Sequence, residues 1–285
     1  MIRRTLAEVM TRDTEPHQIP ETLYGNLIDA VRKNLILAPM SMKIGAGSIK
    51  GSSIDIVTED RDSSAVHSIG EGQEVPIDLG ETSTFNLKPT KFGLRPVVTK
   101  EMQEDGQWDM ITWNMNLAGY KMADKLDTLL FTELDTGAAL TTDDNGASRT
   151  ANTTSGAFNF ANLTATMKML EEDGYKCTDM ICHPAVVEDI RNIAEFVHAD
   201  KSGTTNPSQG LIGRIFGMDV HMSRNATSNY AYIIDRRHAL IYAEKRPVTI
   251  ERYNDVTRDL SGVVVTARWD ARYLRPDAMA YIDTS

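Results

Sequence analysis

Two segments with the alternation of β-strands flank a long polar stretch, and this arrangement most constrains how the chain can fold. Ile54 and Ile56 alternate with polar residues, and Phe85 and Leu87 do so further along. The two segments are therefore predicted as the legs of a long hairpin. Two prolines interrupt the second leg, which is typical of edge strands. A two-stranded hairpin is only marginally stable alone in water, so it must lie on its own chain or on a neighbour.

The stretch "SIGEGQEVPIDLG" (residues 68–80) is predicted as the tip of this hairpin. It contains three glycines, one proline and three acidic residues, and no lysine or arginine. Catalytic loops usually carry a base, a nucleophile or a cluster of ligands, and none stands here in recognisable order. The composition therefore favours a contact surface over a site for chemistry.

A long helix is predicted over residues 108–136, with Gly137 as its stop. Its apolar residues recur at spacings of three and four: Ile111, Met115, Ala118, Met122, Leu126 and Leu129. A helix of roughly 29 residues is ~43 Å long at 1.5 Å per residue, well above the ordinary length. Such a helix beside a long hairpin indicates an elongated subunit and not a compact enzyme.

The remaining pattern mixes helices and strands without regular βαβ alternation, which indicates an α+β fold. Helices are expected over 20–35, 162–175 and 184–197, with a polar loop over 198–210. Strands are expected over 177–184 and before 223, as a hairpin-like pair over 229–245, and in the closing segment 262–282. In that closing segment Val263, Val265, Ala267 and Trp269 are predicted to share one face.

Composition excludes several classes of protein. Of 285 residues, 41% are hydrophobic and 25% charged, which indicates a folded, soluble chain with a core. The net charge of −10 argues against extensive direct nucleic-acid binding. No apolar run approaches the ~20 residues of a membrane helix, and the N-terminus does not resemble a signal peptide. Cys177 and Cys182 are expected as small buried apolar residues.

No catalytic or ligand constellation stands out. The stretch "IGAGSIKGSS" has Lys-Gly-Ser where a phosphate-binding loop needs Gly-Lys-Ser/Thr. The six histidines show no metal-binding spacing, and His198 with Asp200 is the best of a poor set of catalytic candidates. The paired acids Asp143–Asp144 are expected on a solvated turn. We therefore predict no enzymatic activity, no cofactor and no metal.

In its order of elements the chain resembles the major capsid proteins of tailed viruses, the Hong Kong-97 fold family. The segments that carry the resemblance are "GEGQEVP" (70–76), "TFNLKPTKFGLRPVVTKEMQED" (84–105), "LIGRIFGMDVHMS" (211–223), "TIERYND" (249–255) and "ARWDARYLRPDAMAYI" (267–282), the last with Pro276 and Ala278. The resemblance covers the chain from about Pro20 onward. One departure concerns covalent crosslinks, which some relatives form through a lysine in the extended loop. Residues 51–87 contain no lysine.

The resemblance implies an α+β capsid fold with five parts. They are an N-terminal arm and short helix (1–40), an extended two-stranded loop (41–100), a peripheral domain with a long spine helix (101–145), an axial domain (146–262) and closing strands of the peripheral domain (263–285). The tip of the extended loop is expected to contact neighbouring subunits through Glu71, Gly72, Glu74, Val75, Pro76 and Ile77. Glycines there permit the backbone variation that different subunit angles require.

The implied function is that of a major capsid protein assembling as hexamers and pentamers into an icosahedral shell around double-stranded DNA. The expected partners are further copies of the chain, portal, scaffold or decoration proteins, and DNA bound without sequence specificity, with no membrane. The expected location is the virion, assembled in the host cytoplasm. An encapsulin shell around an enzyme cargo is the alternative, although the N-terminal stretch lacks the two-helix start of that group. An enzyme of unknown class is the third possibility, for which the sequence offers no site.

Overall fold

The computed structural model describes residues 35–59, 66–75, 77, 82–105, 110–140, 152–153, 158–192 and 211–284. The helix predicted over 20–35, the loop over 198–210, Asp143–Asp144 and Pro76 lie outside these residues. The chain divides into two compact units. The first comprises Leu35 and the described residues of Thr90–Leu126 and Arg246–Arg268. The second comprises the described residues of Ile36–Pro89, Asp127–Lys245 and Trp269–Ser285.

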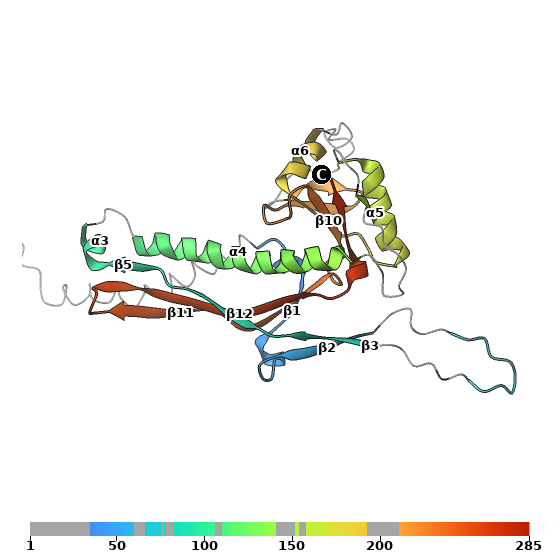
Figure 1. Ribbon diagram of the computed structural model, residues 1–285, viewed down its shortest axis with the longest axis horizontal. Coiled ribbons are helices and arrows are strands. Elements are labelled where there is room, and N and C mark those ends of the chain that lie inside the picture. Colours follow the sequence, from blue (N-terminus) through green and yellow to red (C-terminus); the bar gives the residue numbers. More distant parts are fainter. Residues whose placement is uncertain are drawn as a thin grey trace, which may run out of the picture. The chain divides into compact units, whose positions relative to one another are not determined.

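The long helix predicted from the spacing of apolar residues is confirmed. It is α4 (Met110–Ala138), with 29 residues (Figure 1). Within the first unit its buried side chains are Met115, Ala118, Met122, Ala123 and Leu126. Their spacing of three and four places them along one side of the helix.

The first unit also contains edge strands and a short helix. These are β4 (Thr90–Leu94), β5 (Val97–Thr99) and α3 (Lys100–Asp105). Both strands pair with β12 (Leu260–Tyr273), which pairs in turn with β11 (Leu240–Asp255). Pro89 and Pro96 lie just outside β4 and β5, as predicted for edge strands, because proline has no N–H for a ladder.

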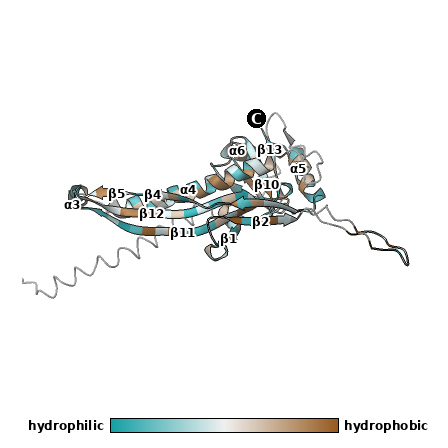
Figure 2. Ribbon diagram, turned by 60° about the horizontal axis from the view of Figure 1, so that its bottom comes forward, coloured by the Kyte–Doolittle hydropathy of each residue, from teal (hydrophilic) through white to brown (hydrophobic). Residues whose placement is uncertain are grey.

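Figure 2 shows that both hydrophilic and hydrophobic residues lie along β11 and β12. In β12, Val263, Val265, Ala267 and Trp269 are buried, which confirms the face predicted for the closing segment. Gly262 is required by close packing, because an added Cβ there would lie 2.3 Å from Pro96 O. Lys100 ties α3 to the β11–β12 turn through an ion pair of 2.5 Å with Asp259.

The second unit contains a six-stranded sheet and two helices. The strand order is β6 (Asn152–Thr153), β13 (Met279–Asp283), β10 (Tyr230–Ile234), β7 (Asp179–Cys182), β9 (Met218–Met222) and β8 (Leu211–Ile215). The helices α5 (Phe160–Glu172) and α6 (Pro184–Asn192) lie beside this sheet (Figure 1). Leu163 and Leu170 of α5 and Val187 of α6 share one buried cluster with strand residues. These helices and β7 confirm the predicted elements.

One interpretation of the sequence is wrong about strand partners. The segment over 229–245 is not a hairpin, because β10 pairs with β13 and β7 while β11 pairs with β1 (Met42–Ile44) and β12. The closing segment contributes one strand to each of two sheets. After β12 the chain passes a short 3₁₀ turn, Pro276–Ala278, and β13 enters the six-stranded sheet beside β10.

The hairpin predicted from the two alternating segments is confirmed. Strands β2 (Ile54–Glu59) and β3 (Thr82–Leu87) pair antiparallel, with Ile54 opposite Leu87 and Ile56 opposite Phe85. These four apolar residues pack with a small buried cluster that includes Ile241 and Ala243. The second leg is shorter than predicted, because β4 and β5 leave the hairpin and pair with β12. The 3₁₀ turns Ala38–Met40 and Ala46–Ser48 flank β1.

Candidate functional site

The stretch between β2 and β3 contains a tight turn in the residues predicted to form the tip. Gln73 N donates to Gly70 O at 3.1 Å, and Gly72 has φ +80°, a conformation that favours glycine. Glu71, Gly72 and Glu74 are exposed, as are Val75 (67%) and Ile77 (88%). Of the six predicted contact residues only Pro76 lies outside the described residues. The described five present acidic and apolar side chains to solvent, and their contact role stays a prediction.

The outer part of the hairpin is held by polar contacts and not by a core. Thr58 Oγ1 and Ser83 Oγ lie 2.6 Å apart near the outer end of the ladder. Nearer the base, Asn86 Nδ2 donates a short hydrogen bond to Asp55 across the ladder. Val57 is 60% exposed although it is a β-branched apolar residue in a strand. Burial therefore decreases from the base of the hairpin toward its tip.

An open cavity of about 600 Å³ lies at the base of the hairpin. Its lining comes from β3, from α4 and from the end of β12, and includes Thr84, Asn86, Lys88, Glu133, Asp270 and Arg272. Burial raises the pKa of Glu133, against the opposing effects of Arg272 and of a backbone hydrogen bond from Tyr273. No sequence pattern singled out these residues, because they come from three distant segments.

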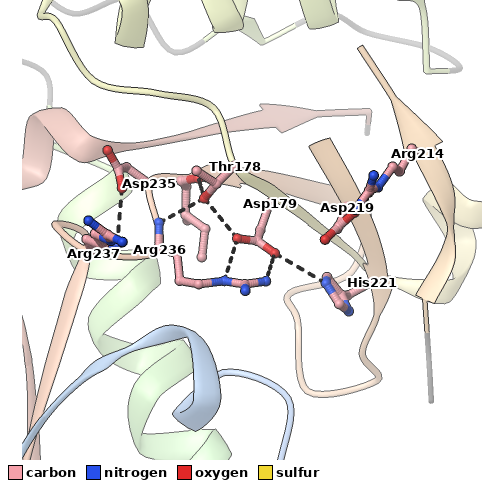
Figure 3. Close-up of polar contacts among 9 residues, drawn as sticks. Thr178, Asp179, Arg214, Asp219, His221, Asp235, Arg236 and Arg237 are labelled. Atoms are coloured by element: carbon pink, nitrogen blue, oxygen red, sulfur yellow. Dashed lines mark hydrogen bonds and ion pairs between the residues drawn. The ribbon is translucent and has the colours of Figure 1, made fainter. Parts of the chain in front are cut away.

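A second polar cluster lies on β7, β9 and the connection after β10 (Figure 3). The Arg236 guanidinium donates to both oxygens of Asp179, at 3.0 and 2.5 Å, and Thr178 Oγ1 donates to the same carboxylate at 2.8 Å. His221 Nε2 lies 3.3 Å from Asp179 Oδ1. Burial alone raises the pKa of Asp179, but nearby His221 and the hydrogen bonds from Arg236 and Thr178 outweigh it and hold the pKa below its usual value.

This cluster includes residue types that can hold a metal. Asp179, Asp219 and His221 place one possible ligand atom each within 4.8 Å of one another. Both carboxylates already have guanidinium partners, since Arg214 Nε donates to Asp219 at 2.6 Å. The charges are balanced within the cluster, so we interpret it as a structural link between β7, β9 and Arg236.

The two cysteines behave as small apolar residues, which confirms the prediction for them. Both thiols are free; Cys182 is fully buried and Cys177 partly so. Burial raises the pKa of both, that of Cys177 to about 12. A thiol with such a pKa is not a nucleophile near neutral pH. The catalytic candidates His198 and Asp200 lie outside the described residues.

An exposed apolar row lies on α4 within the first unit. Trp113 (61%), Leu117 (39%) and Tyr120 (49%) are exposed at the spacing i, i+4, i+7. Residues at this spacing share one face of a helix. Contiguous exposed apolar surface is typical of contact sites in proteins that assemble. No helix among the described residues is long and apolar enough to cross a membrane.

Comparison with known families decides the class of protein. The family described as phage capsid protein matches residues 82–282, about 70% of the chain. This chain belongs to the phage capsid protein family. The match runs from β3 through α4 to β13, so among the described elements it leaves out only β1, β2 and the 3₁₀ turns Ala38–Met40 and Ala46–Ser48. A search of the curated proteins finds no match.

Solved capsid structures share the fold of this capsid protein. The mature capsid of bacteriophage PhiM1 matches with a TM-score of 0.67 and 14% identity, over 88% of this chain and 87% of that one. The capsid of cyanophage P-SCSP1u matches with a TM-score of 0.70 and 11% identity, over 88% of each chain. A virus-like particle from Pyrococcus furiosus matches with a TM-score of 0.60 and 14% identity, over 92% and 98%. The predicted Hong Kong-97-type α+β fold is thereby confirmed.

The protein is accordingly a structural subunit of a phage capsid, as the sequence indicated. The family match supports a structural role in the virion and self-association in a shell. It does not favour the encapsulin alternative, although one structural neighbour is an archaeal virus-like particle. Among the described residues, none of the side-chain clusters indicates a catalytic site.

Proposed function

We propose that this capsid protein assembles as hexamers and pentamers into an icosahedral shell that encloses double-stranded DNA. The observation that carries this proposal is the β2–β3 hairpin. Its base is anchored in the subunit, whereas its described tip residues are exposed and include Val75 and Ile77. A projecting hairpin with exposed apolar residues gains stability when a neighbouring chain covers it.

Charge also favours contact between copies through this hairpin. Residues 54–87 contain eight acidic residues and one arginine, so they account for seven of the ten net negative charges of the chain. The strands of the first unit have the opposite balance. Residues 90–98 and 246–254 contain Lys91, Arg95, Arg246 and Arg252 against a single acid, Glu251. We infer that the acidic hairpin of one copy lies on these basic strands of the next, because complementary charge fixes orientation and excludes wrong partners.

Further partners follow from the same proposal. We propose that the shell has a portal for DNA entry, that scaffold or decoration proteins are its further partners, and that it forms in the host cytoplasm. Packaged DNA is held without sequence specificity. The acidic balance of the chain suits this role, since a negatively charged container does not adhere to the DNA inside it.

Sedimentation and electron microscopy of the purified chain test the proposal. We expect capsomers or closed shells of megadalton mass at micromolar concentration, with or without a co-expressed scaffold. Nucleic acid recovered from shells made in infected cells would support the DNA container, whereas shells holding one enzyme would support the encapsulin alternative. A species of 31.6 kDa under all salt conditions and with all phage-encoded proteins present would overturn the proposal.

A further inference from the structure

The exposed apolar row on α4 continues along the same side of the helix to a buried carboxylate. Trp113, Leu117 and Tyr120 are exposed at the spacing i, i+4, i+7, and Asp127 follows Tyr120 by seven residues in the same continuous helix. Seven residues make nearly two full turns, so the direction of the side chain changes by only about 20°. Asp127 therefore lies in line with the exposed row.

The chain enters the described part of the protein at this carboxylate. Ile36 N donates to Asp127 Oδ2 at 2.9 Å, and Leu37 N donates to Asp127 Oδ1 at 3.3 Å. Asp127 is only 2% exposed and Leu37 is completely buried, so this junction is fixed within the core. The N-terminal segment is thus attached at a point in line with the exposed row.

The sequence before this junction predicts a helix that needs a surface to cover it. Residues 20–34 lie outside the described residues. In their sequence Pro20 stands where a helix can begin, and Leu23, Leu27 and Val31 recur at a spacing of four, so they share one side of a helix. A helix of about 15 residues is only marginally stable alone in water, and its apolar stripe favours packing on another apolar surface.

The exposed row and this segment have matching lengths. Trp113 lies 14 residues before Asp127 in α4, a rise of about 21 Å, and residues 20–34 would span about 22 Å as a helix. A helix that begins at the junction and runs back beside α4 therefore ends near Trp113. No linker intervenes, because only Leu35 separates this segment from Ile36.

We propose that residues 20–34 pack as a helix on the exposed row of α4 in their own subunit. The direct connection favours the segment of the same chain over that of a neighbour, since a short tether gives it a high effective concentration at the row. Ile36 and Asp127 are 91 positions apart, and two helices that run side by side in the same direction keep this offset. Leu27 then comes level with position 118, beside Leu117. This contact lies within one subunit and goes beyond the proposed shell.

Paired cysteines test this placement in unassembled full-length subunits at low concentration. Leu27→Cys with Leu117→Cys should form an intramolecular disulfide on mild oxidation at least about tenfold faster than Asn26→Cys with Leu117→Cys. Asn26 is level with Leu117 in the proposed register, but it is turned by about 100° from Leu27 on its helix. The native thiols do not compete, since Cys182 is fully buried and burial raises the pKa of Cys177 to about 12.

Tryptophan quenching gives a second measurement that leaves α4 unchanged. Leu27→Asp places a charge in the apolar stripe and should release the segment, so acrylamide should quench Trp113 about twofold more strongly than in the wild type. Asn26→Asp adds the same charge outside the stripe and serves as the matched control, with quenching close to wild type. The increase should disappear in a Trp113→Phe background, which assigns it to this residue among the three tryptophans of the chain.

Three outcomes overturn the inference. Equal oxidation rates of the two cysteine pairs would show that the segment does not lie on the row. Disulfide-linked dimers in place of the intramolecular bond would assign the row to a second copy of the chain. Equal quenching of Leu27→Asp and the wild type also contradicts the inference, and this comparison decides alone if the cysteine variants do not fold. Failure to form shells would contradict the proposed function but not this contact, because both measurements use unassembled subunits.

Discussion

Ile54 of β2 and Leu87 of β3 lie directly opposite each other in the antiparallel ladder, and this pair forms the inner end of the hairpin. Leu87 is completely buried. Five positions further out, Glu59 pairs with Thr82, which is exposed. The core of the subunit therefore holds only the base of the hairpin, and the remainder depends on polar contacts or on another chain.

This gradient in burial predicts that two truncations in the hairpin change the stability of the isolated subunit by very different amounts. Leu87→Ala should destabilise the isolated subunit by about 2–5 kcal/mol, as expected for a buried large-to-small change. Val57→Ala, at a site 60% exposed, should change subunit stability by less than about 0.5 kcal/mol. Thermal or denaturant unfolding of unassembled subunits measures both. Equal effects would mean that the outer hairpin has a core of its own.

The Asp179–Arg236 pair predicts a pH-dependent contribution to stability. The folded pKa of Asp179 lies below that of the unfolded chain, so its stabilisation is present above about pH 4 and is lost as the pH falls through the folded value. Asp179→Asn should lower the free energy of unfolding at pH 7 by about 1–3 kcal/mol. The loss is limited to this range because Arg236 is 46% exposed and stays hydrated. The difference in the free energy of unfolding between Asp179→Asn and the wild type should become smaller below about pH 4.

Asp219→Asn is the matched control for that measurement. This substitution also removes one carboxylate charge, on the adjacent strand β9. Its partner Arg214 is 59% exposed, so the free energy of unfolding should fall by less than about 1 kcal/mol. A larger loss for Asp219→Asn than for Asp179→Asn would show that the buried pair is not the one that stabilises this sheet.

A larger residue in place of Gly262 is predicted to disturb the packing between β5 and β12. A methyl group there would lie 2.3 Å from Pro96 O and 2.9 Å from Val97 Cα, both backbone atoms that cannot rotate away. Gly262→Ala should therefore destabilise the subunit by about 1–3 kcal/mol. Gly47→Ala, where an added Cβ meets nothing within 4 Å, serves as the control in the same unfolding experiment. Indistinguishable midpoints would contradict the close packing of β5 on β12.

The part of the extended loop between residues 51 and 87 predicts that mature particles have no covalent crosslinks through a lysine of that stretch. Residues 51–87 contain none, so boiled particles should give a single band near 31.6 kDa on a denaturing gel. Bands at multiples of five or six subunits would show that another amine, such as Lys88 or Lys91, reacts instead.

The features predicted well from sequence are those encoded by local patterns. The alternation at Ile54 and Ile56 located β2, and the spacing of Met115, Ala118 and Met122 located α4, because each pattern describes one element facing one core. The exposed tip residues followed from composition in the same way. These elements together were enough for the resemblance to capsid proteins.

The choice of strand partners could not be predicted in this way. β10 and β11 are separated by five residues and look like a hairpin, yet β10 pairs with β7 and β13. Between them lies Asp235, a buried carboxylate that accepts the backbone N–H groups of Lys176 and Arg237. Such a contact joins positions 59 residues apart, and no periodicity signals it.

The cavity at the base of the hairpin could not be predicted from the sequence for a related reason. Asn86 is an ordinary polar residue of a strand, and Glu133 is one of several acids on a long helix. Their significance comes from burial without a partner, which depends on the packing of three distant segments. The same is true of Arg236, whose bidentate bond to Asp179 spans 57 residues.

Replacing residues 68–80 by a short turn tests most directly whether the hairpin is an arm for neighbouring subunits. Circular dichroism and melting of the variant subunit are measured alongside electron microscopy of its assemblies. We predict a folded subunit with a melting temperature close to wild type, because the described residues of this stretch are exposed, and a failure to close stable shells. A subunit that unfolds, or normal heat-resistant shells, would contradict the account.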